Sequence, residues 1–298
     1  DAHDWGIWHD EMKFEEFEQR IPRFMSEMGF QALPALTTIK TFAPEEDLNL
    51  DSKSLLAHQK HPRGNKLIYE YLQRDLPSPT NFKSLIYLNQ LNQAEGIGLA
   101  ITAHRLAKPY CMGTLYWQLN DCWPGISWSS IDYWGRWKAL QHKTKNVFQP
   151  VLVSAKTTGD KIEIFANSDK MAPILVTVKI AVQTLDKRDI ALDTLYIKMG
   201  TQQCKRIYTL DKIKLFENLQ EDQTVLKIDW NYDSISSQSL TFFTKLKHVK
   251  FRKPTFKIDS LVLTNEGYKF LISSTEFCKA VYIEENESSS FFPNFFDL

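Results

Sequence analysis

The sequence predicts an α/β segment followed by all-β, immunoglobulin-like sandwich domains. Before residue 150, runs with helical spacing of apolar residues alternate with short strand-like runs. After Gln149-Pro150 the chain carries short alternating or apolar runs with weak helix signals, which is typical of a sandwich. Pro254 marks a second boundary. We therefore expect three units, at 1–150, 151–254 and 255–298, the last being the start of a second, truncated sandwich.

Composition excludes several classes of protein. The 298 residues are 43% hydrophobic and 24% charged, which suits two or three globular domains. Formal net charge is zero, so no nucleic-acid partner is expected. No apolar run reaches about 18 residues, so we expect no membrane span. Four scattered cysteines give neither a disulfide scaffold nor zinc spacing, and we expect no metal or cofactor. Cys111 and Cys122 are expected as buried thiols.

The elements of the first unit follow from apolar spacing. Residues 13–20 predict a short helix, and residues 23–30 a buried strand. Leucines at three-residue spacing predict a long helix at 82–106. The other elements expected here are helices at 52–60, 65–76 and 136–148 and a strand at 113–119.

Residues 151–254 and 255–298 are predicted to form strands only. Their short apolar runs are β-rich and separated by turn residues. A glycosylation sequon, Asn286-Glu287-Ser288, matters only in a secreted eukaryotic protein. The expected strands lie at 151–155, 162–165, 174–185, 194–197, 206–210, 225–230 and 240–246, and then at 258–263, 268–273 and 280–283.

The stretch 113–140 indicates the kind of α/β unit. Its strand ends in a polar turn, Asn120-Asp121, and a helix follows from Arg136. A strand that leads into a polar and aromatic loop and then a helix is one unit of a (β/α)8 TIM barrel, whose active site lies at that end. A complete barrel takes eight strands and about 250 residues. Residues 1–150 hold two convincing strands, so we expect a partial barrel, the last strands of a larger protein.

Two side chains at strand ends are the main candidates for chemistry. Glu27 lies near the end of an apolar strand, where a lone buried charge is costly and is tolerated where a site needs it. The alternative is a surface carboxylate or one paired with Arg23. Trp117 offers a flat indole for the apolar face of a ligand, or else packs in the core. Asn120 and Asp121 either hydrogen-bond the hydroxyls of a ligand or cap their turn.

Two motifs resemble the β-mannosidases of glycoside hydrolase family 2. The runs Tyr116–Pro124, Ser127–Asp132 and Gly135–Leu140 resemble the last barrel strand and its loop. The run Ser26–Gln31 resembles the Ser-Glu-aromatic-Gly-Phe-Gln motif of the seventh strand, with Met28 departing from the aromatic residue. The resemblance implies that Glu27 is the nucleophile.

The resemblance also implies the sugar contacts. Trp117 corresponds to the aromatic platform beneath the nonreducing mannose. Trp5, Trp8 and His9 resemble the aromatic loop after the sixth strand, which implies that Trp8 and His9 contact sugar, although His9 could equally be a surface residue.

The implied activity is a retaining exo-β-mannosidase that acts on a β-mannoside or a mannan-derived oligosaccharide. Such an enzyme needs two carboxyl groups about 5–5.5 Å apart. In the family the acid/base belongs to an Asn-Glu pair after the fourth strand, and no such pair precedes Glu27. We therefore expect this chain to be inactive alone. Exposed edges of the truncated units favour self-association.

Two alternatives remain open. One is another family-2 glycosidase: a β-galactosidase, a β-glucuronidase or an exo-glucosaminidase. The other is a non-catalytic carbohydrate-binding sandwich at 151–298, although Trp230 is its only tryptophan. The family resemblance alone suggests a periplasmic, secreted or lysosome-like location.

Overall fold

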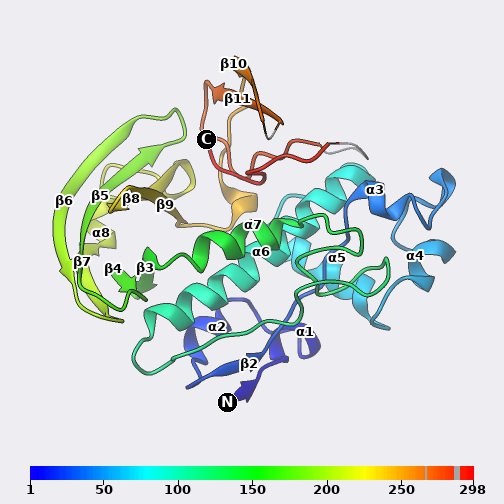
Figure 1. Cartoon of the computed structure of the whole chain (residues 1–298), viewed down its shortest axis with the longest axis horizontal. Coiled ribbons are helices and arrows are strands. Elements are labelled where there is room, and N and C mark those ends of the chain that lie inside the picture. The colour runs from blue at the N-terminus through cyan, green and yellow to red at the C-terminus, as the bar shows by residue number, and fades with distance from the viewer. Residues whose placement is uncertain (266, 285–288) are drawn as a thin grey trace.

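The computed structural model describes residues 1–265, 267–284 and 289–298, and the sequon Asn286-Glu287-Ser288 lies outside them. Figure 1 shows a helix-rich part, a curved β-sandwich beside it, and a two-stranded ribbon near the C-terminus. The long helix α6 (Phe82–Leu106) runs through the middle of the helix-rich part. The predicted sandwich is therefore confirmed, and it lies next to the segment that carries the candidate catalytic residues.

The sandwich consists of two antiparallel sheets. One has the strand order β3-β4-β7 and the other β6-β5-β8-β9. Inward residues alternate along each strand, as with Ile162, Ile164 and Ala166, all fully buried. The strands are β3 (Val151–Thr158), β4 (Lys161–Ser168), β5 (Ile174–Thr184), β6 (Asp189–Met199), β7 (Cys204–Asp211), β8 (Thr224–Tyr232) and β9 (Ile235–Phe242).

Helix α6 has the bounds that leucine spacing predicts. It begins with a capping box, in which Asn81 Oδ1 accepts from the Ser84 backbone N–H and Ser84 Oγ accepts from the Asn81 N–H, both at 2.9 Å. The other helices are α1 (Gly6–His9), α2 (Glu16–Gln19), α3 (Leu36–Ile39), α4 (Lys53–Ala57), α5 (Gly64–Asp75), α7 (Ala139–Val147) and α8 (Lys212–Leu215), with 3₁₀ turns at Glu45–Asp47, Glu221–Gln223 and Leu246–His248.

The strands of the first unit are shorter than expected. Of the strand expected at 23–30, only Met25–Glu27 forms, as β2, and it pairs in parallel with β1 (Ala2–His3). The expected strand at 113–119 is reduced to a parallel bridge between Met25 and Thr114. Its outer side chains, Leu115 and Leu119, are exposed, with no further strand beside them in the described part of the chain. A strand that has a neighbouring strand on one side alone forms a shorter hydrogen-bonded ladder. The unit thus presents three adjoining parallel segments, and a barrel is not seen.

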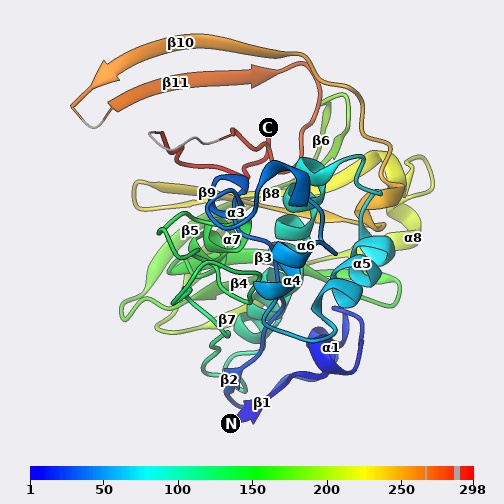
Figure 2. The same ribbon diagram turned by 90° about the vertical axis from the view of Figure 1, so that its right-hand side faces the viewer.

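The C-terminal region departs from the sandwich pattern. Within the part of the chain that the structure describes, strands β10 (Phe256–Thr264) and β11 (Gly267–Ser274) pair only with each other, and they project away from the rest, as Figure 2 shows. The expected strand at 280–283 is wrong, since only Val281 forms a bridge, to Phe296.

The described residues bear on the expectations for cysteines, membrane-spanning helices and metal ligands. All four cysteines there are free; Cys111 is buried, but Cys122 is exposed because its neighbour Asp121 turns inward. No helix among these residues is long and apolar enough to cross a membrane. Within the same ranges, no group of three or more His, Cys, Asp or Glu side chains is placed to hold a metal.

Candidate active site

Glu27 lies at the end of β2 and is held by an indole. Trp5 Nε1 donates to Glu27 Oε1 at 2.8 Å, and His3 Nδ1 lies 3.9 Å from Oε2. The carboxylate side chain is 27% exposed, so one edge of it remains open to solvent. Arg23 lies over the Tyr110 ring, 5.3 Å from its centroid, and no ion pair joins it to Glu27. The alternative of an Arg23 partner is therefore not observed.

Trp117 adjoins the Glu27 segment through the backbone. Its N–H donates to Met28 O at 2.7 Å, and the peptide between Trp117 and Gln118 is cis. A Cβ on Gly29 would lie 2.4 Å from Trp117 O and 2.9 Å from the Trp5 ring, so this position must be glycine for the segments to approach. The Trp117 side chain is 46% exposed. The structure thus brings Glu27 and an exposed Trp117 onto neighbouring segments.

An aromatic and imidazole cluster extends from Trp5. Its ring centroid lies 5.4 Å from that of His9, which in turn is 5.2 Å from His61. His9 is exposed, whereas Trp8 is fully buried and packs edge-on against Phe30 at 4.9 Å. Burial lowers the pKa of His61, and the neighbouring His9 adds to this effect. Trp8 therefore supports the cluster from beneath, with no surface for a ligand in this conformation.

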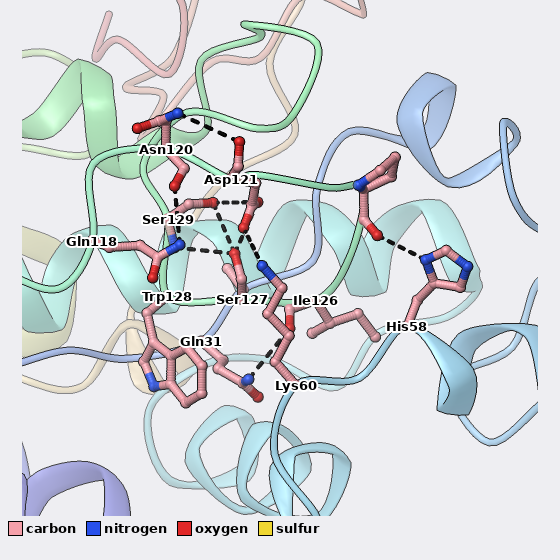
Figure 3. A network of polar contacts seen from close by, with 12 residues as sticks. Gln31, His58, Lys60, Gln118, Asn120, Asp121, Ile126, Ser127, Trp128 and Ser129 are labelled. Carbon is pink, nitrogen blue, oxygen red and sulfur yellow. Dashed lines mark hydrogen bonds and ion pairs between the residues drawn. The ribbon is translucent and has the colours of Figure 1, made fainter.

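Asp121 is the centre of a buried polar network, shown in Figure 3. Its side chain is fully buried and accepts from Lys60 Nζ at 2.9 Å, Ser127 Oγ at 2.9 Å and Ser129 Oγ at 2.7 Å. These contacts favour the loop-stabilising interpretation of Asp121 over sugar binding. Asn120 is exposed beside it, so of the pair Asn120 alone has a side chain that a ligand can reach.

Several residues that support the site were not predicted from sequence. Lys138 is fully buried, and its Nζ donates to Ala32 O at 3.0 Å and Ser127 O at 3.4 Å, so it joins the segment after Glu27 to the segment after Trp117. From α6, Gln93 Nε2 donates to Phe30 O at 2.7 Å. A possible signal was the run of amides on the predicted helix, Asn89, Gln90, Asn92 and Gln93, because buried amides need backbone partners.

Comparison with known proteins gives matches to a domain family, to sequence relatives and to solved structures. Residues 160–248 match the model of a family described as a Mannosidase Ig/CBM-like domain. The β-mannosidases B of Aspergillus niger and Aspergillus terreus are 37% and 35% identical to this chain over 161 residues. In both cases the match covers 52% of this chain and 19% of the relative. The chain thus spans about a fifth of the length of these relatives.

Solved structures show the same fold. The β-D-mannosidase of Dictyoglomus thermophilum matches all of this chain, and 36% of its own, with a TM-score of 0.89 at 23% identity. An exo-chitosanase of Amycolatopsis orientalis, CsxA, matches 94% of this chain and 38% of its own, with a TM-score of 0.73 at 13% identity. Both structural matches are below 25% identity and show the fold of this chain. Together with the domain match and the sequence relatives named as β-mannosidases, they confirm the resemblance of this chain to the β-mannosidases of glycoside hydrolase family 2.

Proposed function

We propose that this chain is the part of a retaining exo-β-mannosidase that carries its nucleophile, Glu27. One observation carries the proposal: a partly exposed carboxylate at a strand end is fixed by the Trp5 indole and lies on a segment adjoining the exposed Trp117. The sequence relatives named as β-mannosidases support mannose as the sugar.

The proposal includes a partial barrel over 1–150. The three parallel segments β1, β2 and Thr114 would be neighbouring barrel strands, with Glu27 and Trp117 at one end of them, as active sites of such barrels require. The sandwich would then occupy 151–254, and 255–298 would begin a second one.

The chemistry assigns a role to each carboxylate oxygen. Trp5 occupies Oε1 and so fixes the orientation of the group, which leaves Oε2 to attack the anomeric carbon. The new C–O bond forms as the glycosidic bond breaks, and an acid/base carboxyl from outside these residues protonates the leaving oxygen. Water then attacks the anomeric carbon and the bond to Glu27 breaks, while the same acid/base group takes up a proton from that water; two inversions give net retention.

The exposure of each side chain separates the proposed sugar contacts from the residues that support the site. Trp117, Asn120 and His9 have exposed side chains, so they can contact a mannose bound at Glu27. The indole of Trp117 would lie against the apolar face of the ring. Trp8 and Asp121 are buried, and we assign them to the support of the site.

The test is the Glu27→Gln variant of the full-length protein. We expect kcat on an aryl β-mannoside to fall by roughly 10⁴-fold or more, as for loss of other nucleophiles, while Glu16→Gln, an exposed acid on α2, retains activity. The β-anomer of mannose should be the first product in proton NMR. Undiminished activity of Glu27→Gln, or initial release of the α-anomer, would refute the proposal.

Three further measurements address the alternatives. We expect the 298-residue chain alone to be inactive; hydrolysis that Glu27→Gln removes would show that it holds a complete site. A preference of the full-length protein for a β-galactoside, β-glucuronide or β-glucosaminide would assign it to another family-2 activity. An inactive full-length protein that binds mannan through residues 151–298 would be a binding module.

A further inference from the structure

A cavity of about 340 Å³ lies between the helix-rich part and the sandwich. Helices α2 and α6 form one wall, and strands β3 and β9 form the other. None of its lining residues belongs to the cluster around Glu27. Ligand sites are frequent at such domain interfaces, and this volume lies within their usual range of about 300–1,000 Å³.

The cavity walls carry hydrogen-bond acceptors without partners. The Glu18 carboxylate makes no hydrogen bond or ion pair within the described ranges, since Lys156 Nζ bonds only to its backbone oxygen, at 3.4 Å. Burial raises the pKa of Glu18. Asn92 is only 2% exposed; its amide nitrogen donates to Tyr71 O, whereas its Oδ1 has no partner in the same ranges. The unpaired buried Asn92 Oδ1 is costly, and a bound donor that also reached the part-buried Glu18 carboxylate would satisfy both acceptors.

The charges around the cavity disfavour an ionic ligand. Lys245 pairs with both Glu15 and Asp75, and Lys143 pairs with Glu95. The cavity lining holds four carboxylates, of Glu15, Glu18, Asp75 and Glu95, and three lysines, Lys143, Lys156 and Lys245. These opposite charges largely cancel, and burial raises the pKa of Glu18, so the cavity strongly favours neither an anion nor a cation. An uncharged hydrogen-bond donor is therefore the ligand that suits these groups.

Hydroxyl and apolar side chains complete the surface. Thr102 from α6, Ser154 from β3 and Thr241 from β9 contribute hydroxyls, and Leu99 and Phe242 contribute apolar contacts. A sugar presents hydroxyl donors around an apolar ring face, which matches this mixture. We propose that this interdomain cavity is a second carbohydrate-binding site, which takes an uncharged mono- or disaccharide. It does not depend on the proposed role of Glu27.

The test is calorimetric titration of the 298-residue chain with methyl β-D-mannoside and with β-1,4-mannobiose. We expect saturable binding that Glu18→Gln weakens by roughly tenfold, as expected for loss of one charge-assisted hydrogen bond. Glu16→Gln, on the exposed side of the same helix, should bind like the wild type. Ser154→Trp should fill the cavity and abolish binding, whereas Thr158→Trp, on the same strand but outside the cavity lining, should not.

The outcomes separate this site from the one around Glu27. Trp117→Ala should leave the binding of at least one saccharide intact. Absence of saturable binding by the wild type would overturn the proposal, as would binding that Trp117→Ala abolishes and Glu18→Gln leaves unchanged. If Ser154→Trp does not fold, Glu18→Gln decides, because it removes the charge and keeps the side-chain volume. None of these results bears on hydrolysis by the full-length protein.

Discussion

At the scale of one residue, burial distinguishes Asp121, which we assign to the support of the site, from exposed residues that can contact a ligand. Replacing Asp121 with Asn would leave the part-buried Lys60 ammonium, whose side chain is 17% exposed, without its counter-ion. Breaking one member of a buried pair costs about 3–5 kcal/mol, so we expect Asp121→Asn to lower the free energy of unfolding by about 3 kcal/mol. Chemical denaturation measures this directly.

The adjacent residue provides the control. Asn120 is exposed, and Asn120→Ala should change the free energy of unfolding by less than about 0.5 kcal/mol. If Asp121→Asn instead left stability unchanged and weakened sugar binding, Asp121 would be a ligand contact after all.

Lys138 makes stability depend on pH. Burial lowers its pKa from 10.5 to about 8. Between these values the folded lysine is neutral and the unfolded one is protonated, so the unfolded state binds the extra proton and stability rises with pH. The shift corresponds to about 3 kcal/mol. We expect wild type to gain about this much relative to Lys138→Met between pH 8 and 10.5.

An exposed lysine gives the matched comparison. The stability difference between wild type and Lys53→Met should not vary over the same pH interval. A flat difference for Lys138→Met as well would mean that the Lys138 ammonium is solvated in the folded protein, contrary to its contacts with Ala32 O and Ser127 O.

At the scale of elements, the approach of β2 to the Trp117 segment depends on Gly29. An added Cβ would lie 2.4 Å from Trp117 O, a backbone atom that cannot rotate away. Overpacking of this kind costs about 1–3 kcal/mol, and we expect Gly29→Ala to lower the free energy of unfolding by that amount. Gly200→Ala, whose Cβ would lie 3.4 Å from the nearest side-chain atom, should cost much less. Equal stability of the two variants would show that the segments separate easily.

The elements also show what the sequence can and cannot predict. The bounds of α6 follow from local information, because leucine spacing and a cap are encoded within the helix. The strand expected at 113–119 fails because a ladder needs neighbours, and pairing is not local. The candidate site divides in the same way: Glu27 is proposed as a site residue from its local motif. That Asp121 is buried depends on Lys60, some sixty residues away, which no local pattern reveals.

At the scale of the whole molecule, the two sheets of the sandwich differ from the β10–β11 ribbon in how far their faces are covered. The sandwich buries the inner faces of both its sheets, with Val178, Ile180 and Ile228 in its core. Among the described residues no second sheet covers strands β10 and β11: Leu261, Leu263 and Tyr268 are 65%, 69% and 69% exposed. An isolated two-stranded ribbon is marginally stable in water, and exposed apolar residues on it favour association. The ribbon is therefore the region where this chain departs most from a self-sufficient fold.

We expect the chain to self-associate through this ribbon. Light scattering should give a mass above the 34.7 kDa of one copy that rises with concentration. Leu261→Lys combined with Leu263→Lys should restore the mass of one copy, because charged side chains on a ribbon oppose pairing. Leu175→Lys, on β5 and 74% exposed, removes an equally exposed leucine from the sandwich and should leave association unchanged. A wild-type chain that stays monomeric at high concentration would show that the ribbon tolerates its exposure, and association that only Leu175→Lys disrupts would locate the contact on the sandwich instead.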